Sequence, residues 1–290
     1  MSLKKEKDIE SLEERTEKIV IDRVIVKEAV AETELLETIN KVSLAVAELT
    51  AVLGKERVTT DPTILKHYSR DFYIPVKKAA FESVSSTGIL VLPATDEEAA
   101  ECLRIANDYD IPVTTVTSGA KVVFNTTPSI HSAMIMDLRL MGRKISKPAD
   151  IPPLILRFIL ERWSELLEPL KHRFVEAGLV GASFTEKSAD APFDRVNYYF
   201  DRDGALKFDF ESDEDKGKTI ITYKDFETGF RSLEDKNFDS MKAFLEGHFK
   251  IEPSPEEALK MAPMMPDMIE AHKKAVIDAE KKFNIELPRY

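Results

Sequence analysis

Apolar and polar residues alternate over residues 206–210, where Leu206, Phe208 and Phe210 are separated by single charged residues. A period of two places one set of side chains on a buried face of a β-strand and leaves the other set in water. The stretch therefore predicts a half-buried strand. Residues 219–222, a short β-branched run, predict a second strand in the same half of the chain.

A hairpin and several helices are predicted around these strands. Residues 196–200 and 205–210 flank a turn that ends at Gly204, so we expect the sheet to begin with this hairpin. Apolar positions take helical spacing over residues 223–230, and residues 240–245 predict a helix that Gly247 can end.

Two more helices are expected toward the C-terminus. Ser254, Pro255 and Glu257 form a capping box with proline at the first helical position. Residues 267–283 predict a terminal helix. Its expected apolar face is Ile269, His272, Val276 and Ala279.

The first half of the chain predicts a different unit. Leu35, Ile39, Val42, Val46, Leu49 and Leu53 recur every three or four residues before Gly54. We expect this helix to pack on the following unit, with a dimer contact as the alternative. Residues 4–18 are charged and suit a solvated or partner-binding helix, whereas residues 19–26 fit strand and helix equally.

A β-α-β-β unit is predicted after this helix. Residues 88–92 are continuously apolar, as in a strand covered on both faces, and residues 111–117 and 132–138 supply two more strands. Thr95 and Glu98 form a capping box. The helix that they start is expected to bury Ala99, Cys102, Ile105 and Ala106.

Prolines cluster in residues 147–153, which we interpret as a linker. The predicted division is an N-terminal helical extension (1–39), an α/β unit (40–147) and a second domain (148–290). The helix that opens the second domain shows an apolar face made by Ile155, Ile159, Trp163, Leu166 and Leu170. The fold class is therefore α+β.

Composition excludes several functions. The formal charge of the 290 residues is -11, which argues against nucleic acid as a partner. No run approaches the length of a membrane span and the N-terminus lacks an apolar signal core, so we predict a cytoplasmic protein. Cys102 is the only cysteine and is expected to be a buried apolar side chain. The five histidines show no ligand spacing, and no metal site is predicted.

The C-terminal half resembles the sterol carrier protein type 2 family. The residues that carry this resemblance are Thr219-Ile220-Ile221-Thr222, Asp225-Phe226, Gly229, Ala243-Phe244, Gly247, Lys250-Ile251 and Ala258. The resemblance implies a five-stranded sheet covered by helices around an apolar tunnel for sterols, fatty acids or acyl-CoA. It implies no catalytic residues.

Aromatic and methionine side chains are the candidate lipid-binding residues. They are Phe208, Phe210, Phe226, Phe244, Leu245, Met264, Met265 and Met268. Methionine adapts to apolar surfaces of variable shape. The methionine segment, interrupted by Pro263 and Pro266, is therefore either a ligand gate or gap-filling core.

Residues from about 40 to 143 resemble the first half of the flavin-binding domain of the FAD-linked oxidases. The matching residues are Leu53-Gly54, Val58, Asp61, Tyr68-Ser69-Arg70-Asp71, Leu90-Val91-Leu92-Pro93-Ala94-Thr95, Glu97-Glu98, Ile111-Pro112-Val113-Thr114 and Met134-Ile135-Met136-Asp137-Leu138. That family holds pyrophosphate on a glycine-rich loop. The equivalent stretch here is Thr117, Ser118, Gly119, Ala120 and Lys121, with one glycine. We therefore expect no cofactor, and FAD in particular is not expected to bind.

Three functions remain open from the sequence. The leading hypothesis is non-catalytic binding of an apolar ligand by the carrier-like domain, with the flavin-domain remnant as scaffold or docking surface. The first alternative is a subunit of an FAD-linked oxidoreductase that another chain completes. The second is a structural or interaction subunit without ligand. In each case the N-terminal helices could form a homodimer or bind a partner subunit.

Overall fold

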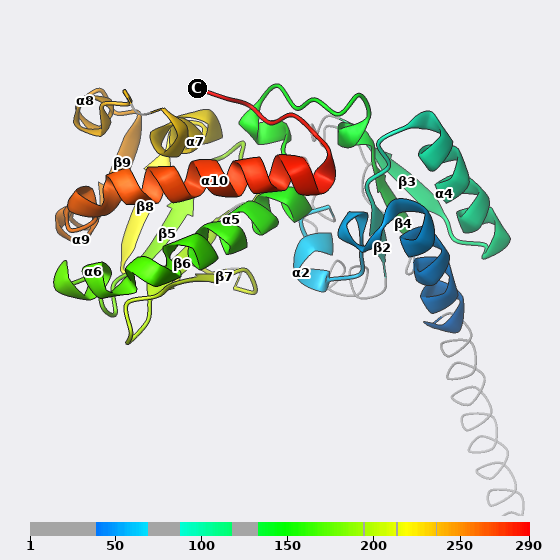
Figure 1. The fold of residues 1–290 in the computed structure, drawn as a ribbon, viewed down its shortest axis with the longest axis horizontal. Coiled ribbons are helices and arrows are strands. Elements are labelled where there is room, and N and C mark those ends of the chain that lie inside the picture. The colour runs from blue at the N-terminus through cyan, green and yellow to red at the C-terminus, as the bar shows by residue number, and fades with distance from the viewer. Residues whose placement is uncertain (1–38, 69–87, 118–132, 194, 213, 236) are drawn as a thin grey trace, which may run out of the picture.

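The computed structural model describes residues 39–68, 88–117 and 133–290, except the single residues 194, 213 and 236. The N-terminal extension and the expectations for residues 4–26 lie outside this part. Two β-sheets lie beside each other along the long axis of the molecule, joined by α5 and the C-terminal segment (Figure 1).

The first sheet has the strand order β1-β2-β4-β3, in which β2, β4 and β3 are parallel and β1 is antiparallel to β2. A helix of residues 39–53 precedes it. The elements of this unit are β1 (Val58–Thr59), α2 (Pro62–Leu65), β2 (Ile89–Val91), α4 (Asp96–Asp108), β3 (Val113–Val116) and β4 (Met134–Asp137). The predicted β-α-β-β unit is confirmed.

Both faces of this sheet are covered, because every residue of β2 is fully buried. Ile89 and Val91 pack with Leu49 of helix 39–53 and with Ile105 of α4, whereas Leu90 faces the second unit. Val42, Val46, Leu49 and Leu53 of the predicted stripe thus pack on the helix's own sheet, whereas Ile39 is exposed. Cys102 lies in the same cluster, and burial raises the pKa of its thiol to about 11, so it is an inert apolar side chain as predicted.

The predicted capping box of α4 forms with one change. Thr95 Oγ1 accepts from the Glu98 amide at 3.2 Å, but the Glu98 carboxylate accepts from the amide of Ala94, at 2.7 Å, rather than from that of Thr95. The same carboxylate binds Arg57 through two hydrogen bonds of 2.6 and 2.8 Å. This bidentate contact is the largest cause of the lowered pKa of Glu98, and it ties α4 to the start of β1.

The second sheet has five strands in the order β7-β6-β5-β8-β9, and only β5 and β8 are parallel. The elements of this unit are α5 (Pro153–Leu167), α6 (Lys171–Glu176), β5 (Ser183–Lys187), β6 (Val196–Phe200), β7 (Leu206–Asp209), β8 (Thr219–Tyr223), α7 (Phe226–Glu234), α8 (Ser240–Leu245), β9 (Phe249–Glu252), α9 (Glu256–Leu259) and α10 (Met265–Phe283). This is the five-stranded, helix-covered architecture that the sterol carrier resemblance implies.

The hairpin of β6 and β7 forms as predicted, but the sheet does not begin there. Gly204 has a φ of +82°, and a Cβ at this position would lie 2.5 Å from the carbonyl oxygen of Lys171, so both conformation and space require glycine. The central strand β5 precedes the hairpin in sequence. The pattern missed β5 because Ser183 and Glu186, one on each face, are polar.

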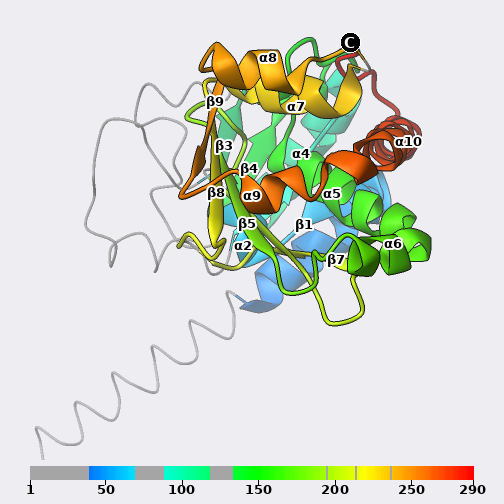
Figure 2. The same cartoon turned by 90° about the vertical axis from the view of Figure 1, so that its left-hand side faces the viewer.

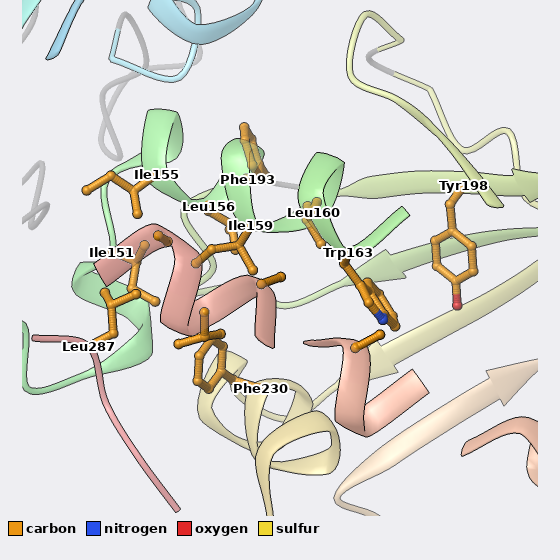
Figure 3. Packing of buried hydrophobic residues seen from close by; sticks show 14 of the residues in the cluster. Ile151, Ile155, Leu156, Ile159, Leu160, Trp163, Phe193, Tyr198, Phe230 and Leu287 are labelled. Carbon is orange, nitrogen blue, oxygen red and sulfur yellow. The ribbon is translucent and has the colours of Figure 1, made fainter. Parts of the chain in front are cut away.

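The helices α5, α7 and α10 cover one face of the second sheet, and α5 and α10 lie side by side across it (Figures 1 and 2). Their apolar residues form one buried cluster, seen around Ile159 and Phe230 in Figure 3. The buried face of α10 is wider than the face that the sequence predicted. It includes Met268, Ala271 and Ala275 in addition to His272, Val276 and Ala279.

Residues 214–217 cross the opposite face of the second sheet. Gly217 lies so close that a Cβ would be 2.2 Å from the backbone of Phe184 and Thr185. Its amide donates to Thr185 Oγ1 at 2.8 Å, and that hydroxyl donates to Asn197 Oδ1 at 2.6 Å. The buried Asn197 side chain in turn donates to the carbonyl oxygen of Glu214 at 3.0 Å. This network satisfies the buried side chains of Thr185 and Asn197 on the sheet face that no described helix covers.

The predicted linker, residues 147–153, is a packed joint rather than an extended path. Pro148–Asp150 forms a 3₁₀ turn and Ile151 is fully buried. Beside it, Tyr68 and Arg139 both hydrogen-bond the buried carboxylate of Asp137, at 2.7 and 2.6 Å. The buried cluster of the second unit continues into the first, so the domain boundary near residue 148 stays a prediction that needs a folding experiment.

Candidate functional site

A partly open apolar chamber lies between the five-stranded sheet and the helices α5, α7 and α10. Its volume is about 60 Å³. Seven aromatic side chains contribute to its wall, namely Trp163, Phe193, Tyr198, Phe208, Tyr223, Phe226 and Phe230. We call this space the chamber. A concave, mostly apolar space of this kind is where a protein binds an apolar small molecule.

Strand register and helix spacing bring the aromatic residues together. Tyr198 of β6 and Phe208 of β7 are register partners, and their ring centroids are 5.8 Å apart. Trp163 comes from the apolar face of α5, with its centroid 6.1 Å from Phe208, and its Nε1 donates to the carbonyl oxygen of Met268 at 3.0 Å. The expectation that Trp163 lies on the inner face of this helix is confirmed, and Trp163 lines the chamber.

Glu186 of β5 places one carboxyl group in the chamber wall. The hydroxyl of Tyr198 donates to Glu186 Oε1 at 2.8 Å, and no described residue gives this carboxyl group a second hydrogen bond. Burial raises the pKa of Glu186, although the hydrogen bond from Tyr198 opposes this effect. Burial and the nearby charge of Glu186 likewise raise the pKa of Tyr223. Burial in the chamber wall therefore makes ionisation of Glu186 less favourable than in water.

His272 and Glu234 form a buried pair at the side of the chamber, with Nδ1 and Oε1 2.8 Å apart. The imidazole lies edge-on to the rings of Trp163 and Phe230, at 5.4 and 5.5 Å. The pair fastens α7 to α10 and fixes this part of the wall. Periodicity placed His272 on the inner face of its helix, but it carried no signal for a partner 38 residues away.

The predicted lipid-binding residues are not all brought together. Phe208 and Phe226 line the chamber. The other six lie elsewhere: Phe210 is stacked on Phe208 on its outer side, Phe244 packs on Phe249, Leu245 is 77% exposed, Met264 and Met268 are buried core, and Met265 is partly buried. Leu245 ends a six-residue surface helix, which explains its exposure.

The methionine segment is part of the helical core. Pro263 lies in a 3₁₀ turn, and Pro266 occupies the first turn of α10, where proline needs no backbone hydrogen bond. The prolines therefore start helices rather than interrupt one. Buried Met264 and Met268 fill space beside α5, which favours the gap-filling interpretation of this segment over the gate.

Sequence reasoning missed Glu186, Phe193 and Tyr223 as wall residues. Tyr223 directly follows the predicted strand 219–222 and is the last residue of β8. Its position on the inner face follows from the period of two once the strand is extended by one residue. Glu186 had no such signal, because a lone acid in a polar stretch is typical of a surface.

A surface groove lies outside the chamber, between α2, α5 and the edge strand β7. We call this space the groove; its volume is about 620 Å³. Arg157 crosses its floor, where Nη1 binds Asp61 Oδ2 at 2.6 Å and Nε binds Glu161 Oε1 at 2.8 Å. Phe208 lines both the groove and the chamber.

The stretch that corresponds to the flavin loop lies mostly outside the described residues. Thr117 follows the parallel strand β3 and is exposed, whereas Ser118, Gly119, Ala120 and Lys121 fall in the part that is not described. The expectation that no flavin binds therefore stays a prediction from residue type. The described ranges hold no cluster of three or more His, Cys, Asp or Glu side chains suited to a metal ion.

Comparison with known proteins finds similarity to solved structures alone. No family model matches the chain, and no curated protein matches it. Over 40% of its length the chain is similar to a conserved hypothetical protein of Thermus thermophilus, described as a possible sterol carrier protein, with 15% identity, 85% coverage of that chain and a TM-score of 0.31.

Two further structures are similar at the same level. Sterol carrier protein domain 2 of Helicoverpa armigera shares 18% identity over 39% of this chain and 90% of its own, with a TM-score of 0.28. Sterol carrier protein 2 of Yarrowia lipolytica shares 15% identity over 46% of this chain and 98% of its own, also with a TM-score of 0.28. Within the described residues, no helix has the length and apolar composition needed to cross a membrane.

Proposed function

We propose that this protein binds an apolar ligand, without chemical change, between its five-stranded sheet and the helices α5, α7 and α10. The observation that carries this proposal is the aromatic chamber at that place. A core of this size has no structural need of a space walled by seven aromatic rings and one acid, because interiors normally pack to the density of organic crystals.

The wall residues support binding rather than catalysis. Ser188 Oγ is engaged with Asp190 at 2.5 Å, and the Nδ1 atom of His272 is engaged with Glu234. Neither contact links a hydroxyl to the imidazole as an activated nucleophile requires. Burial of the ligand's alkyl chain stabilises the complex by about 0.8 kcal/mol per methylene. This is sufficient for affinity without any reacting group.

The ligand that we propose is a single-chain lipid, in agreement with the resemblance of the C-terminal half to the sterol carrier family. The first sheet would act as a scaffold. Its residues Leu90 and Ile135 share one buried cluster with Ile155 and Ile159 of α5, so it supports the helix that forms the chamber wall.

The experiment titrates the full chain with dodecanol and follows Trp163, the only tryptophan. Because Trp163 lines the chamber, its emission should change and saturate, and calorimetry should give the same affinity. Phe226→Asp would place a carboxylate in the wall and should abolish binding.

Phe244→Asp is the matched control, since Phe244 is similarly half-buried but does not line the chamber. It should bind like wild type. Equal binding by both variants, or folded wild type that neither yields lipid on organic extraction nor binds dodecanol, would refute the proposal.

A further inference from the structure

The chamber alone is too small for the ligand that it would bind. Its volume of about 60 Å³ is room for roughly four water molecules at about 15 Å³ each. Ligand pockets are typically about 300–1,000 Å³. The adjoining groove, at about 620 Å³, lies within that range.

Phe208 is the one described residue that lines both spaces. On the chamber side, Phe208 lies against Trp163 and Tyr198, with centroids 6.1 and 5.8 Å away. On the groove side it is stacked on Phe210, with centroids 5.8 Å apart and an interplanar angle of 18°. Phe208 is only half-buried, unlike Phe184 and Phe200 deeper in the same sheet.

We infer that the groove is the outer half of the ligand site and that Phe208 is the partition past which a single apolar chain reaches the chamber. This inference rests on the proposed function. The position of Phe208 allows such movement, because β7 is the edge strand and its only ladder in the sheet is with β6. Rotation of the ring breaks no hydrogen bond.

The neighbouring contacts keep the rest of the passage fixed. Ser164 Oγ of α5 donates to the carbonyl oxygen of Leu206 at 2.6 Å, which holds the helix on the edge strand. The guanidinium of Arg157 lies 5.1 Å from the centroid of Phe210, and its ion pair with Asp61 joins α2 to α5. Phe208 is therefore the element free to turn.

The charges of the groove indicate the kind of head group that it would hold. Acids outnumber bases by four to two in its lining: Asp61, Glu161, Asp209 and Glu211 against Arg157 and Lys207. A carboxylate head group would be repelled there. The occupant that we assign is an uncharged single-chain amphiphile, with its hydroxyl in the groove and the end of its chain in the chamber.

The test measures rates as well as affinity. The probe is dodecanol brominated at the chain end, whose bromine quenches Trp163 when the chain enters the chamber. Phe208→Ala should raise the association and dissociation rates together, each by about tenfold, with a smaller change in Kd, because a gate alters both rates. Phe208→Leu should raise both rates by a smaller factor. This variant serves as the test if the alanine variant does not fold.

Phe226→Ala is the matched control, because Phe226 lines the chamber but not the groove. It should raise the dissociation rate and leave the association rate unchanged. An unchanged association rate in folded Phe208 variants, or equal acceleration by Phe226→Ala, would overturn the inference and leave the proposed function intact. Wild type that never shows quenching, and binds no dodecanol by calorimetry, would overturn both.

Discussion

Glu186→Gln tests whether the chamber holds a carboxyl group that is costly to ionise. Glutamine keeps the shape and the hydrogen bond from Tyr198, since its amide oxygen can accept from the hydroxyl as Glu186 Oε1 does at 2.8 Å. It cannot ionise. The substitution therefore isolates the free energy of placing a charge in the chamber wall.

The direction in which stability changes with pH follows from the raised pKa of Glu186. Its folded-state pKa lies above the ordinary value of 4.5 because burial disfavours the charged form. The native state then binds more protons than the unfolded state between these two values. The stability that the native state gains from the protonated Glu186 is fully present below pH 4.5. It is lost as the pH rises through the folded-state pKa.

The magnitude is bounded by linkage. A tenfold change in an ionisation equilibrium corresponds to about 1.4 kcal/mol, so above the folded pKa each tenfold by which burial disfavours ionisation makes wild type about 1.4 kcal/mol less stable relative to the glutamine variant. Urea unfolding of both proteins from about pH 4 to about pH 8 measures this difference. The advantage of Glu186→Gln should be small in acid and grow as the pH rises.

Glu176→Gln is the control, because Glu176 is exposed on the short helix α6. Its stability difference from wild type should not vary with pH in this range. A difference between wild type and Glu186→Gln that is equally flat, or a glutamine variant that is less stable at neutral pH, would mean that the carboxyl group is solvated and the chamber is not apolar.

Three other predictions concern the rest of the chain. Gly217→Ala should destabilise the protein by about 3 kcal/mol in urea unfolding, because its Cβ would push residues 214–217 off the sheet and break the hydrogen bonds that buried Thr185 and Asn197 make with this segment. Lys216→Ala, which changes an exposed side chain, should be nearly neutral. The purified protein should be colourless and gain no flavin absorption on incubation with FAD, and a band that survives desalting would refute this. A fragment of residues 148–290 should melt cooperatively, but at a lower temperature than the full chain because α5 loses its cover; a broad transition would show that the two units share one core.

Much of the second sheet could be predicted from the sequence where one face is uniformly apolar. Leu206 and Phe208 lie on the inner face of β7 and the intervening Lys207 is exposed, so the alternation was a sufficient signal. Helix α5 could be predicted equally well, because its covered face carries aliphatic residues and Trp163 at helical spacing. In these elements each local preference agrees with the final packing.

The central strand β5 could not be predicted in this way. Its inner face carries Phe184 and Glu186, and its outer face carries Thr185, whose burial depends on residues 214–217 folding over it. The pairing that makes β5 central joins it to β8, more than 30 residues later. No local pattern contains that information, because the side chains that bury β5 come from distant segments.

The predicted residues that lie outside the chamber are informative about the site. Leu245 and Phe244 were chosen for apolar character, which many core and surface positions share, and neither lines the chamber. Glu186 was passed over because an acid in a polar stretch is typical of a surface, yet it faces seven aromatic rings. A polar residue that breaks the inward pattern of a central strand lowers stability. Sequence rules are expected to fail at positions where a protein gives up stability for binding. The disagreement at Glu186 therefore supports the chamber, rather than the predicted positions outside it, as the place where a ligand binds.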